Sequence, residues 1–344
     1  DRLRGVGKKV IGGGMHPSMM PEEAAEHFDA VCEGECEEVW NIIVDDAENG
    51  TLKKIYQGTE VDLKNIPVPD RKIFTRLKSD ELKMKYDWEA NMIQVMRGCT
   101  YECESCIIPV QHGKGLRFRP VENVRADIES LKFREFFITD DSIILPKKEC
   151  LSYSEKLFTA ISETNSRIFL SGTLNMKTDP EYLKMLKTGG VVSIYLVTGY
   201  DPLSITAFKK GGKKFFNWSL EIIKKLQDSG LHLFLSFGLG FDYQDQSIFD
   251  TVLEFGEKAG IGTAEFYILT PYPKTPAYNK FIKEDRLLHR NWEKYTTSNV
   301  VFKPAQITEK ELLDGYIYCW KEFYKNRDGD DSVSIFTPRE DKIK

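Results

Sequence analysis

Short apolar runs and amphipathic stretches alternate along most of this chain. From residue 91 onward, apolar runs of strand length recur six times, and a helical pattern follows most of them. Strands that are joined through helices are expected to be parallel, so this alternation predicts six βα units in a curved open sheet or partial barrel. The expected strands are Met92–Met96, Phe136–Ile138, Ile168–Ser171, Val191–Val197, Leu233–Leu239 and Phe266–Leu269. The expected helices are Val121–Lys132, Ser152–Ile161, Pro180–Lys187, Trp218–Gln227 and Ser247–Ala259.

The N-terminal residues repeat this alternation on a smaller scale. Lys9–Gly14 is typical of a strand that runs into a glycine turn, and Pro21–His27 begins a helix with acidic residues in its first turn. A second strand at Ala30–Cys32 and a helix around Glu37–Val44 follow. The segment is too short to close a doubly wound unit, so we interpret residues 1–62 as an incomplete α/β domain.

The remaining boundaries follow changes in composition. Residues 63–90, with Pro67, Pro69 and many charges, are predicted to be a linker. Residues 91–290 would form the partial barrel, and 291–344 a C-terminal helical extension with a polar tail.

The composition narrows the class of protein. With 344 residues, 41% hydrophobic and 29% charged, the chain is expected to fold into a globular structure. Its net charge of −5 argues against a broad nucleic-acid surface. No apolar run reaches the length of a membrane span, and no signal-peptide pattern is present. We therefore expect a cytoplasmic protein with no nucleic-acid partner.

Three of the seven cysteines, Cys99, Cys103 and Cys106, directly follow the first expected barrel strand. Such clustering favours metal or cluster ligands over disulfides. A structural zinc site needs four protein ligands, and only His112 lies near enough to be considered as a fourth. Three thiolates suit a four-iron cluster that keeps one iron open. We expect such a cluster, with zinc as the alternative, and interpret the other four cysteines as small buried hydrophobes.

The segment Arg97–Cys106 resembles the C-x3-C-x2-C loop of the radical SAM enzymes, whose fold is a partial (βα)6 barrel. Other segments resemble the subgroup with an N-terminal cobalamin-binding domain, which includes magnesium-protoporphyrin ester cyclase and the bacteriochlorophyll and hopanoid modifying enzymes. These segments are Gly113–Val124, Thr139–Asp141, Gly238–Asp242 and Leu269–Pro273. Gly12–Ser18 and Gly34-Glu35 are similar to the last third of that cobalamin domain.

The resemblance implies a cofactor set. Cys99, Cys103 and Cys106 would hold three irons of a [4Fe–4S] cluster, and the fourth iron would chelate S-adenosylmethionine. Tyr101 would lie near the adenine, although packing within the loop explains it equally well. A reductant such as flavodoxin or ferredoxin would supply the electron.

Further cofactor contacts are implied at the second strand and its neighbours. The run Thr139-Asp140-Asp141 could accept the methionine ammonium of the cofactor, or Asp141 or Ser142 could instead cap a helix. Thr198 stands at the fourth strand, where relatives commonly carry an acid, which weakens one contact.

The end of the fifth strand carries another candidate set. Gly238 and Gly240 would let the backbone approach a ligand, and Asp242 would contact the cofactor. A tight turn without a ligand is the alternative.

Three cations are weaker candidates for substrate contacts. Arg117 and Arg119 could seat a carboxylate, or they could lie on a surface β pair. Lys274 stands where relatives show glycine in Pro-Gly-Thr-Pro, and it could meet an acidic substrate group or simply be exposed.

The reaction is less defined than the cofactor. No Asp-x-His-x-x-Gly motif is present, so cobalamin is not expected in this chain as given. The missing motif favours hydroxylation or oxidation of a C–H bond. The resemblance to the tetrapyrrole-modifying enzymes implies a large, flat, apolar substrate, such as a bacteriochlorophyllide that is hydroxylated at a ring methyl. The 21 Phe, 15 Tyr and 5 Trp could line its pocket. The alternatives are a cobalamin-dependent C-methyltransferase on a tetrapyrrole, hopanoid or natural product, and a non-catalytic iron–sulfur protein.

Overall fold

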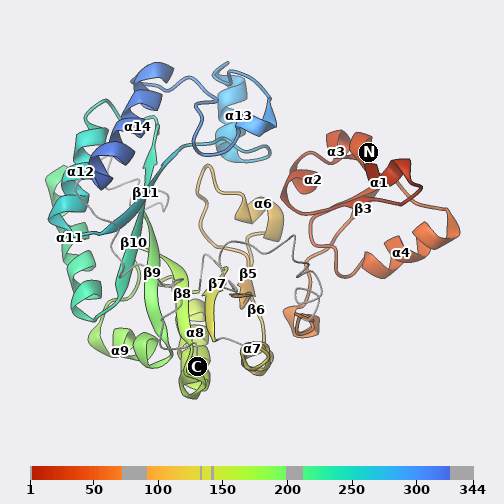
Figure 1. Cartoon of the computed structure of the whole chain (residues 1–344), viewed down its shortest axis with the longest axis horizontal. Helices are drawn as coiled ribbons and strands as arrows, with labels where there is room; N and C mark the ends of the chain where they lie inside the picture. The colour runs from red at the N-terminus through yellow and green to blue at the C-terminus, as the bar shows by residue number, and fades with distance from the viewer. Residues whose placement is uncertain (1, 72–90, 132–133, 141–142, 199–211, 326–344) are drawn as a thin grey trace.

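The chain contains two parallel sheets, each with helices packed on it (Figure 1). The computed structural model describes residues 2–71, 91–131, 134–140, 143–198 and 212–325. The smaller sheet belongs to the N-terminal residues, and the larger one forms the partial barrel. The α/β fold class predicted from the sequence is therefore confirmed. The exact domain limits at residues 62, 90 and 290 stay a prediction.

The N-terminal unit is a three-stranded parallel sheet with the strand order β1-β2-β3. Alanine, cysteine, isoleucine and tyrosine side chains at positions 30, 32, 43 and 56 form its small core. Its strands are β1 (Ile11–Gly12), β2 (Ala30–Glu33) and β3 (Ile55–Gln57). Its helices are α1 (Arg2–Gly5), α2 (Met15–Met19), α3 (Pro21–His27) and α4 (Trp40–Asn49), and a 3-10 turn, η1 (Leu63–Asn65), follows.

The larger sheet has six parallel strands in the order β11-β10-β9-β8-β7-β4. All six expected strands are present in this sheet. They are β4 (Asn91–Ile93), β7 (Glu135–Ile138), β8 (Arg167–Thr173), β9 (Val191–Thr198), β10 (His232–Leu239) and β11 (Thr263–Ile268). The helices between and beside them are α6 (Ile108–His112), α7 (Val121–Glu129), α8 (Lys148–Ile161), α9 (Pro180–Thr188), α11 (Gly212–Asp228), α12 (Ile248–Lys258) and α13 (Pro276–Lys283).

The first expected barrel strand is shorter than predicted. After β4, the chain leaves the sheet, and β5 (Met96–Arg97) pairs antiparallel with β6 (Arg117–Phe118). The physical reason is Asp140, whose Oδ2 accepts hydrogen bonds from the backbone amides of Val95 at 2.6 Å and Met96 at 3.2 Å. A side chain thereby takes the amides that a longer strand would have used in the sheet ladder.

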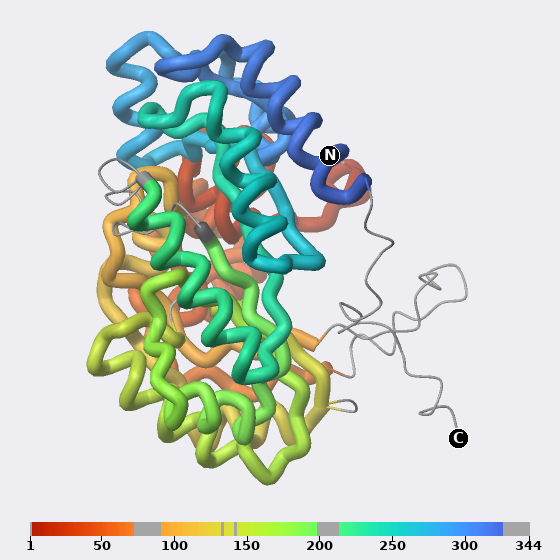
Figure 2. The backbone as a smooth tube through the Cα atoms, turned by 90° about the vertical axis from the view of Figure 1, so that its left-hand side faces the viewer, coloured from red at the N-terminus to blue at the C-terminus, as the bar shows by residue number. Residues whose placement is uncertain are grey.

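Helices α9, α11 and α12 lie side by side on the outer face of the barrel sheet, which Figure 2 turns toward the viewer. Because side chains alternate across a strand, Phe237 of β10 points toward helix α12, while its neighbour Ser236 lines the interior. The C-terminal helix α14 (Glu309–Tyr324) packs on α12 and β11, as a C-terminal helical extension predicts. None of the described helices is long and apolar enough to cross a membrane.

Candidate active site at the cysteine loop

The loop that carries the three cysteines is closed at its base by the β5–β6 pair, in which Arg97 lies opposite Arg117. Gly98 begins the loop with a φ of 88°. A Cβ added there would lie 1.8 Å from the carbonyl oxygen of Gly115. Only glycine fits both the backbone angle and the space, so the sequence Arg97-Gly98-Cys99 fixes where the loop leaves the hairpin.

Cys99, Cys103 and Cys106 are all partly exposed and line one cavity of about 530 Å³. Among the described residues, no group of three or more His, Cys, Asp or Glu lies close enough together to hold a single metal ion. In an iron–sulfur cluster each cysteine binds a different iron, so the three thiols need not converge on one point. Their placement around one open cavity therefore fits a cluster better than the zinc alternative.

Tyr101 is held against the wall of the same cavity. Its hydroxyl accepts a hydrogen bond of 2.8 Å from Nδ2 of Asn175, whose side-chain oxygen accepts one from Thr173. The Nζ atom of Lys147 lies 5.8 Å from the centre of the Tyr101 ring. These contacts hold the ring beside the cysteines, where a ligand in the cavity would touch it.

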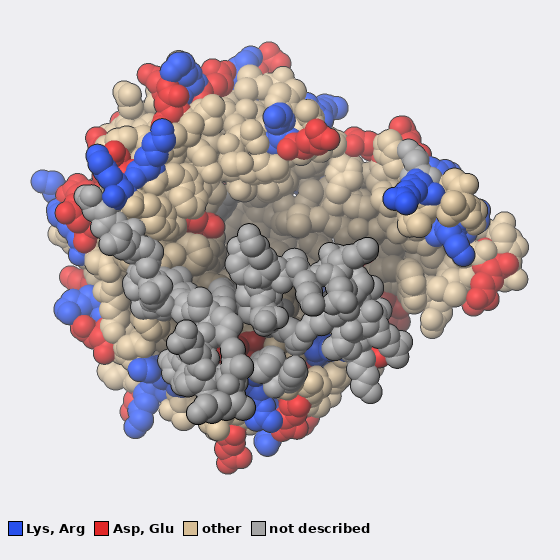
Figure 3. Space-filling view, in the orientation of Figure 1, with Lys and Arg blue, Asp and Glu red and all other residues tan. Residues whose placement is uncertain are grey.

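The opposite wall consists of barrel strands, and sequence reasoning missed it. Its polar and aromatic side chains are Ser171 and Thr173 of β8, Tyr195 of β9, Ser236 of β10, and Glu265 and Tyr267 of β11. The available signal was strand alternation, because polar residues at interior positions of apolar strands mark a lined cavity. Met15 and Tyr272 also contribute to the lining. Figure 3 shows this face hollowed between the N-terminal unit and the barrel, with most charged side chains around the rim.

Two of the residues predicted to bind the cofactor, Thr139 and Asp140, form hydrogen bonds within the protein. Asp140 is 7% exposed and holds the backbone amides described above. Thr139 donates its amide to the carbonyl of Ile93. Neither residue lines the cavity. Asp141 lies outside the described residues. Thr198 is the last residue of β9, and its side chain is also outside the described part.

The turn after β10 is shaped by packing within the protein. Nε2 of Gln244 donates to the Gly238 carbonyl, and its Oε1 accepts from the Gly240 amide. A Cβ on Gly238 would lie 2.6 Å from the Tyr267 hydroxyl oxygen, and one on Gly240 would lie 2.8 Å from a Leu312 methyl carbon. These glycines make room for neighbouring side chains, which agrees with the tight-turn alternative.

Asp242 follows the same turn and forms ion pairs with Lys280 and Arg286, both at 2.6 Å. Burial alone would raise the pKa of this carboxyl, but the hydrogen bonds from Arg286 and Lys280 outweigh it and lower the pKa. Asp242 thus connects the barrel edge to α13 and the segment after it. It does not line the cysteine cavity.

Arg117 takes part in an ion cluster between the N-terminal unit and the cysteine loop. Its Nη2 and Nη1 atoms lie 2.5 and 2.7 Å from the two carboxylate oxygens of Glu35. Arg97 lies 3.1 Å and Nδ1 of His112 lies 2.9 Å from the same carboxylate, and the Val61 amide donates to it. We call this group the Glu35 clamp.

The Glu35 clamp binds the base of the cysteine loop. Arg97 and Arg117 are the facing residues of the β5–β6 pair, and His112 ends helix α6 within the loop. Burial on its own would raise the pKa of Glu35, but the hydrogen bonds from Arg117 and the other donors outweigh it and lower the pKa to about 2. The carboxylate therefore stays charged and ties three points of the loop to the N-terminal unit.

The two other predicted cations also have protein partners. Arg119 is buried, donating to the Gln94 carbonyl at 2.7 Å and to Asp127 at 2.9 Å. Lys274 reaches the N-terminal unit, with its Nζ 2.8 Å from the Ser18 carbonyl oxygen and 2.5 Å from Glu33. Neither of them, nor Arg117, lines the cysteine cavity, so the structure gives no support to their predicted substrate contacts.

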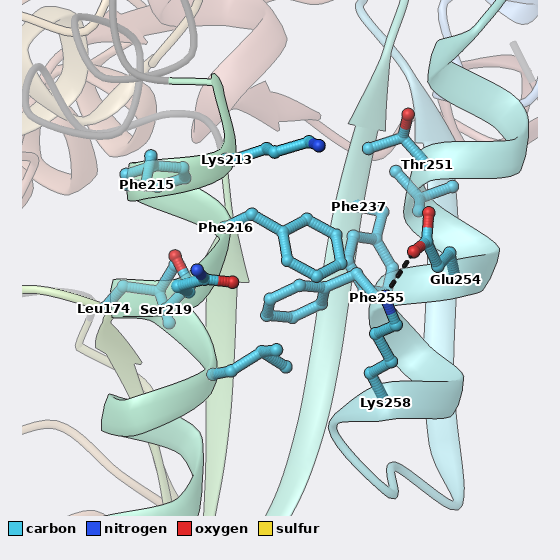
Figure 4. A pocket seen from close by; sticks show the side chains of 13 residues that line it. Leu174, Lys213, Phe215, Phe216, Ser219, Phe237, Thr251, Glu254, Phe255 and Lys258 are labelled. Atoms are coloured by element: carbon cyan, nitrogen blue, oxygen red, sulfur yellow. Dashed lines mark hydrogen bonds and ion pairs between the residues drawn. The ribbon is translucent and has the colours of Figure 1, made fainter.

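A second cavity lies on the helix side of the sheet, between α11 and α12 (Figure 4). It is mainly aromatic, with Phe216, Phe237 and Phe255 in its wall, and Lys258 pairs with Glu254 beside it. It contains no cysteine. The chemistry of the cysteine loop is thus confined to the interior cavity.

Comparison with known proteins agrees with the geometry. Residues 93–255, which run from the end of β4 through β10 and include the cysteine loop, match the family described as the radical SAM superfamily. This stretch of the chain is therefore similar to the radical SAM superfamily. That finding confirms the family resemblance inferred from the C-x3-C-x2-C loop.

Two curated relatives align with nearly the whole chain. Bacteriochlorophyllide d C-12(1)-methyltransferase of Chlorobaculum tepidum is 28% identical, and the alignment covers 94% of this chain and 71% of the relative. Bacteriochlorophyllide d C-8(2)-methyltransferase of the same organism is 29% identical, with 94% and 74% covered.

A solved structure shares the fold over most of this chain. The radical S-adenosylmethionine methyltransferase TsrM of Kitasatospora setae, determined with cobalamin and a [4Fe–4S] cluster bound, superposes with a TM-score of 0.60 at 14% identity. The match covers 80% of this chain and 58% of that one. At this identity the comparison supports the fold alone.

Proposed function

We propose that this protein is a radical SAM C-methyltransferase that acts on a tetrapyrrole of the bacteriochlorophyllide type. The observation that carries the proposal is the pair of bacteriochlorophyllide methyltransferases that align over 94% of the chain. They favour the methyl-transfer alternative over the hydroxylation that we expected from the missing Asp-x-His-x-x-Gly motif. The cavity supports the substrate class, because Tyr101, Tyr195, Tyr267 and Tyr272 give it aromatic walls.

The cysteine loop has the residues for the cofactors of this reaction. Cys99, Cys103 and Cys106 would each bind one iron of a [4Fe–4S] cluster, and Tyr101 would contact the ligand beside it. When bound, the cluster and S-adenosylmethionine supply a 5′-deoxyadenosyl radical that removes hydrogen from an unactivated carbon. Gly98 and the Glu35 clamp fix the base of the loop, and the barrel strands form the opposite wall of the cavity.

The N-terminal unit opens on the same cavity. Met15, which begins α2 directly after the glycine turn, contributes to its lining. At Gly13 and Gly14 of this turn, no neighbouring atom of the described residues lies within 4 Å of the place of a Cβ, so a ligand can approach their backbone. This arrangement is compatible with a methyl carrier such as cobalamin held by the N-terminal unit. Among the described residues, the three-stranded sheet and its glycine turn would form one side of the binding site for this carrier.

The test is product analysis with the reconstituted protein under anaerobic conditions. Magnesium tetrapyrroles would be incubated with S-adenosylmethionine carrying a labelled methyl group and a reductant, with and without methylcobalamin. We expect 5′-deoxyadenosine together with a product that has gained one labelled CH₂ unit. A gain of one oxygen atom would instead establish hydroxylation. If S-adenosylmethionine is not cleaved at all, the non-catalytic iron–sulfur alternative is correct. The Cys103→Ala variant serves as the inactive control.

A further inference from the structure

A carboxylate lies inside the barrel, at the middle of its strands. Glu265 is the third residue of β11, and Ser236 and Tyr195 occupy the middle of the neighbouring strands β10 and β9. All three line the cysteine cavity. Ser236 Oγ donates to Oε1 of Glu265 at 2.8 Å, and the Tyr195 hydroxyl donates to the same oxygen. Both donors therefore act on one carboxylate oxygen.

The charge of Glu265 has no counter-ion in the described part of the protein. Among the described residues lining this cavity, it is the only Asp, Glu, Lys, Arg or His. Its second oxygen, Oε2, accepts no hydrogen bond from the described residues. Glu35 and Asp242, by contrast, each bind at least two cations. A partly buried carboxylate without a cation is costly, unless a ligand or water supplies the missing partner.

We propose that Glu265 anchors an electropositive group of the ligand that fills this cavity, such as an N–H or O–H donor or a metal cation. The inference rests on the proposed function, because that function names the two ligands. S-adenosylmethionine offers hydroxyl and amino donors. A magnesium tetrapyrrole offers its central Mg²⁺, a hard cation that takes oxygen ligands. A ligand made only of hydrocarbon would leave the carboxylate unpaired, so Glu265 also disfavours such substrates.

The hydroxyl groups of Tyr195 and Ser236 fix the orientation of the Glu265 carboxylate. Tyr195 and Ser236 hold Oε1 from the β9 and β10 side, so the carboxylate is oriented before the ligand arrives. A preoriented acceptor loses less entropy on binding than a mobile one. Ser236 and Tyr195 are thus positioning residues, and Glu265 is the group that contacts the ligand.

The experiment measures binding, separately for the two ligands, with reconstituted protein. Glu265→Gln keeps the shape and still accepts from both hydroxyls, so the protein should fold, which thermal melting verifies. Glu129→Gln on the exposed face of α7 is the matched control. Dissociation constants would be determined for S-adenosylmethionine alone and for magnesium, zinc and metal-free forms of one tetrapyrrole. Absorbance spectra of the bound macrocycle would report ligation of its metal.

We expect Glu265→Gln to weaken binding of one ligand about tenfold, as for a lost charge-assisted hydrogen bond, and Glu129→Gln to change nothing. Loss with S-adenosylmethionine assigns the cofactor to Glu265. Loss confined to metal-containing tetrapyrroles, with a spectral shift, assigns the substrate metal. Either result supports the proposal. Wild-type affinity of Glu265→Gln for both ligands overturns it. The proposed function fails separately, if the wild-type protein binds S-adenosylmethionine but neither binds nor methylates tetrapyrroles.

Discussion

The interior cavity and the contact between the N-terminal unit and the barrel use charge in opposite ways. In the contact, Glu35 binds two arginines and a histidine, and Glu33 binds Lys274. Among the described residues that line the cavity, Glu265 is the one carboxylate, and no cationic side chain accompanies it. Charges that hold the fold are already paired, whereas a charge that waits for a ligand is not. Whether a charged side chain has a counter-ion within the protein therefore distinguishes structural residues from proposed ligand-contacting ones better than its residue type does.

The strongest test of the cavity removes one of its thiols. Cys99→Ala, Cys103→Ala and Cys106→Ala should each abolish reductive cleavage of S-adenosylmethionine, because each thiol would be one of three protein ligands of the proposed cluster. Iron content, the visible absorbance of the cluster and 5′-deoxyadenosine formation are the measurements.

The matched control is Cys319→Ala, since Cys319 is fully buried against Phe249 on the helix side of the sheet. It should cost stability, but it should leave the cluster intact. A single cysteine variant of the loop that keeps a normal cluster and turnover would contradict the assignment.

The next effect concerns the Glu35 clamp. Glu35→Gln leaves Arg97 and Arg117 without their shared counter-charge, so we expect a loss of about 3 kcal/mol in unfolding free energy at neutral pH. Because the pKa of Glu35 is lowered from 4.5 to about 2, its stabilisation is complete above about pH 4.5 and is lost as the pH falls toward 2.

Chemical denaturation at several pH values tests this. The wild-type protein should lose more stability than Glu35→Gln between pH 4.5 and 2, so that the two curves converge. Glu129→Gln, an exposed glutamate on α7, is the control and should follow the wild type. Parallel curves for Glu35→Gln and the wild type would show that the clamp carries no pH-dependent stability.

The sequence was sufficient for the fold and for the cysteine loop. Strand periodicity located all six strands of the large sheet. The spacing of the three cysteines is also a local pattern, so it can be recognised without knowledge of the tertiary structure. The charged candidates have protein partners that the local sequence does not reveal, and their predicted substrate contacts stay a prediction. Arg117 and Lys274 are neutralised by Glu35 and Glu33, which are more than 80 and 240 residues away along the chain. Such partners are invisible to local patterns, and so is the isolation of Glu265.

The smallest effect is expected at Lys274, where two terms nearly cancel. Its φ of 63° is a left-handed backbone angle that costs a non-glycine residue about 1 kcal/mol. Its partly exposed ion pair with Glu33 returns at most about 1 kcal/mol. Lys274→Gly loses the pair and the strain together, so its stability should stay within about 1 kcal/mol of the wild type. Lys274→Ala loses the pair but keeps the strain, so it should be the less stable variant in thermal denaturation. If Lys274→Gly is instead the less stable one, the contact with the N-terminal unit outweighs the backbone angle, and the contact is stronger than a surface ion pair.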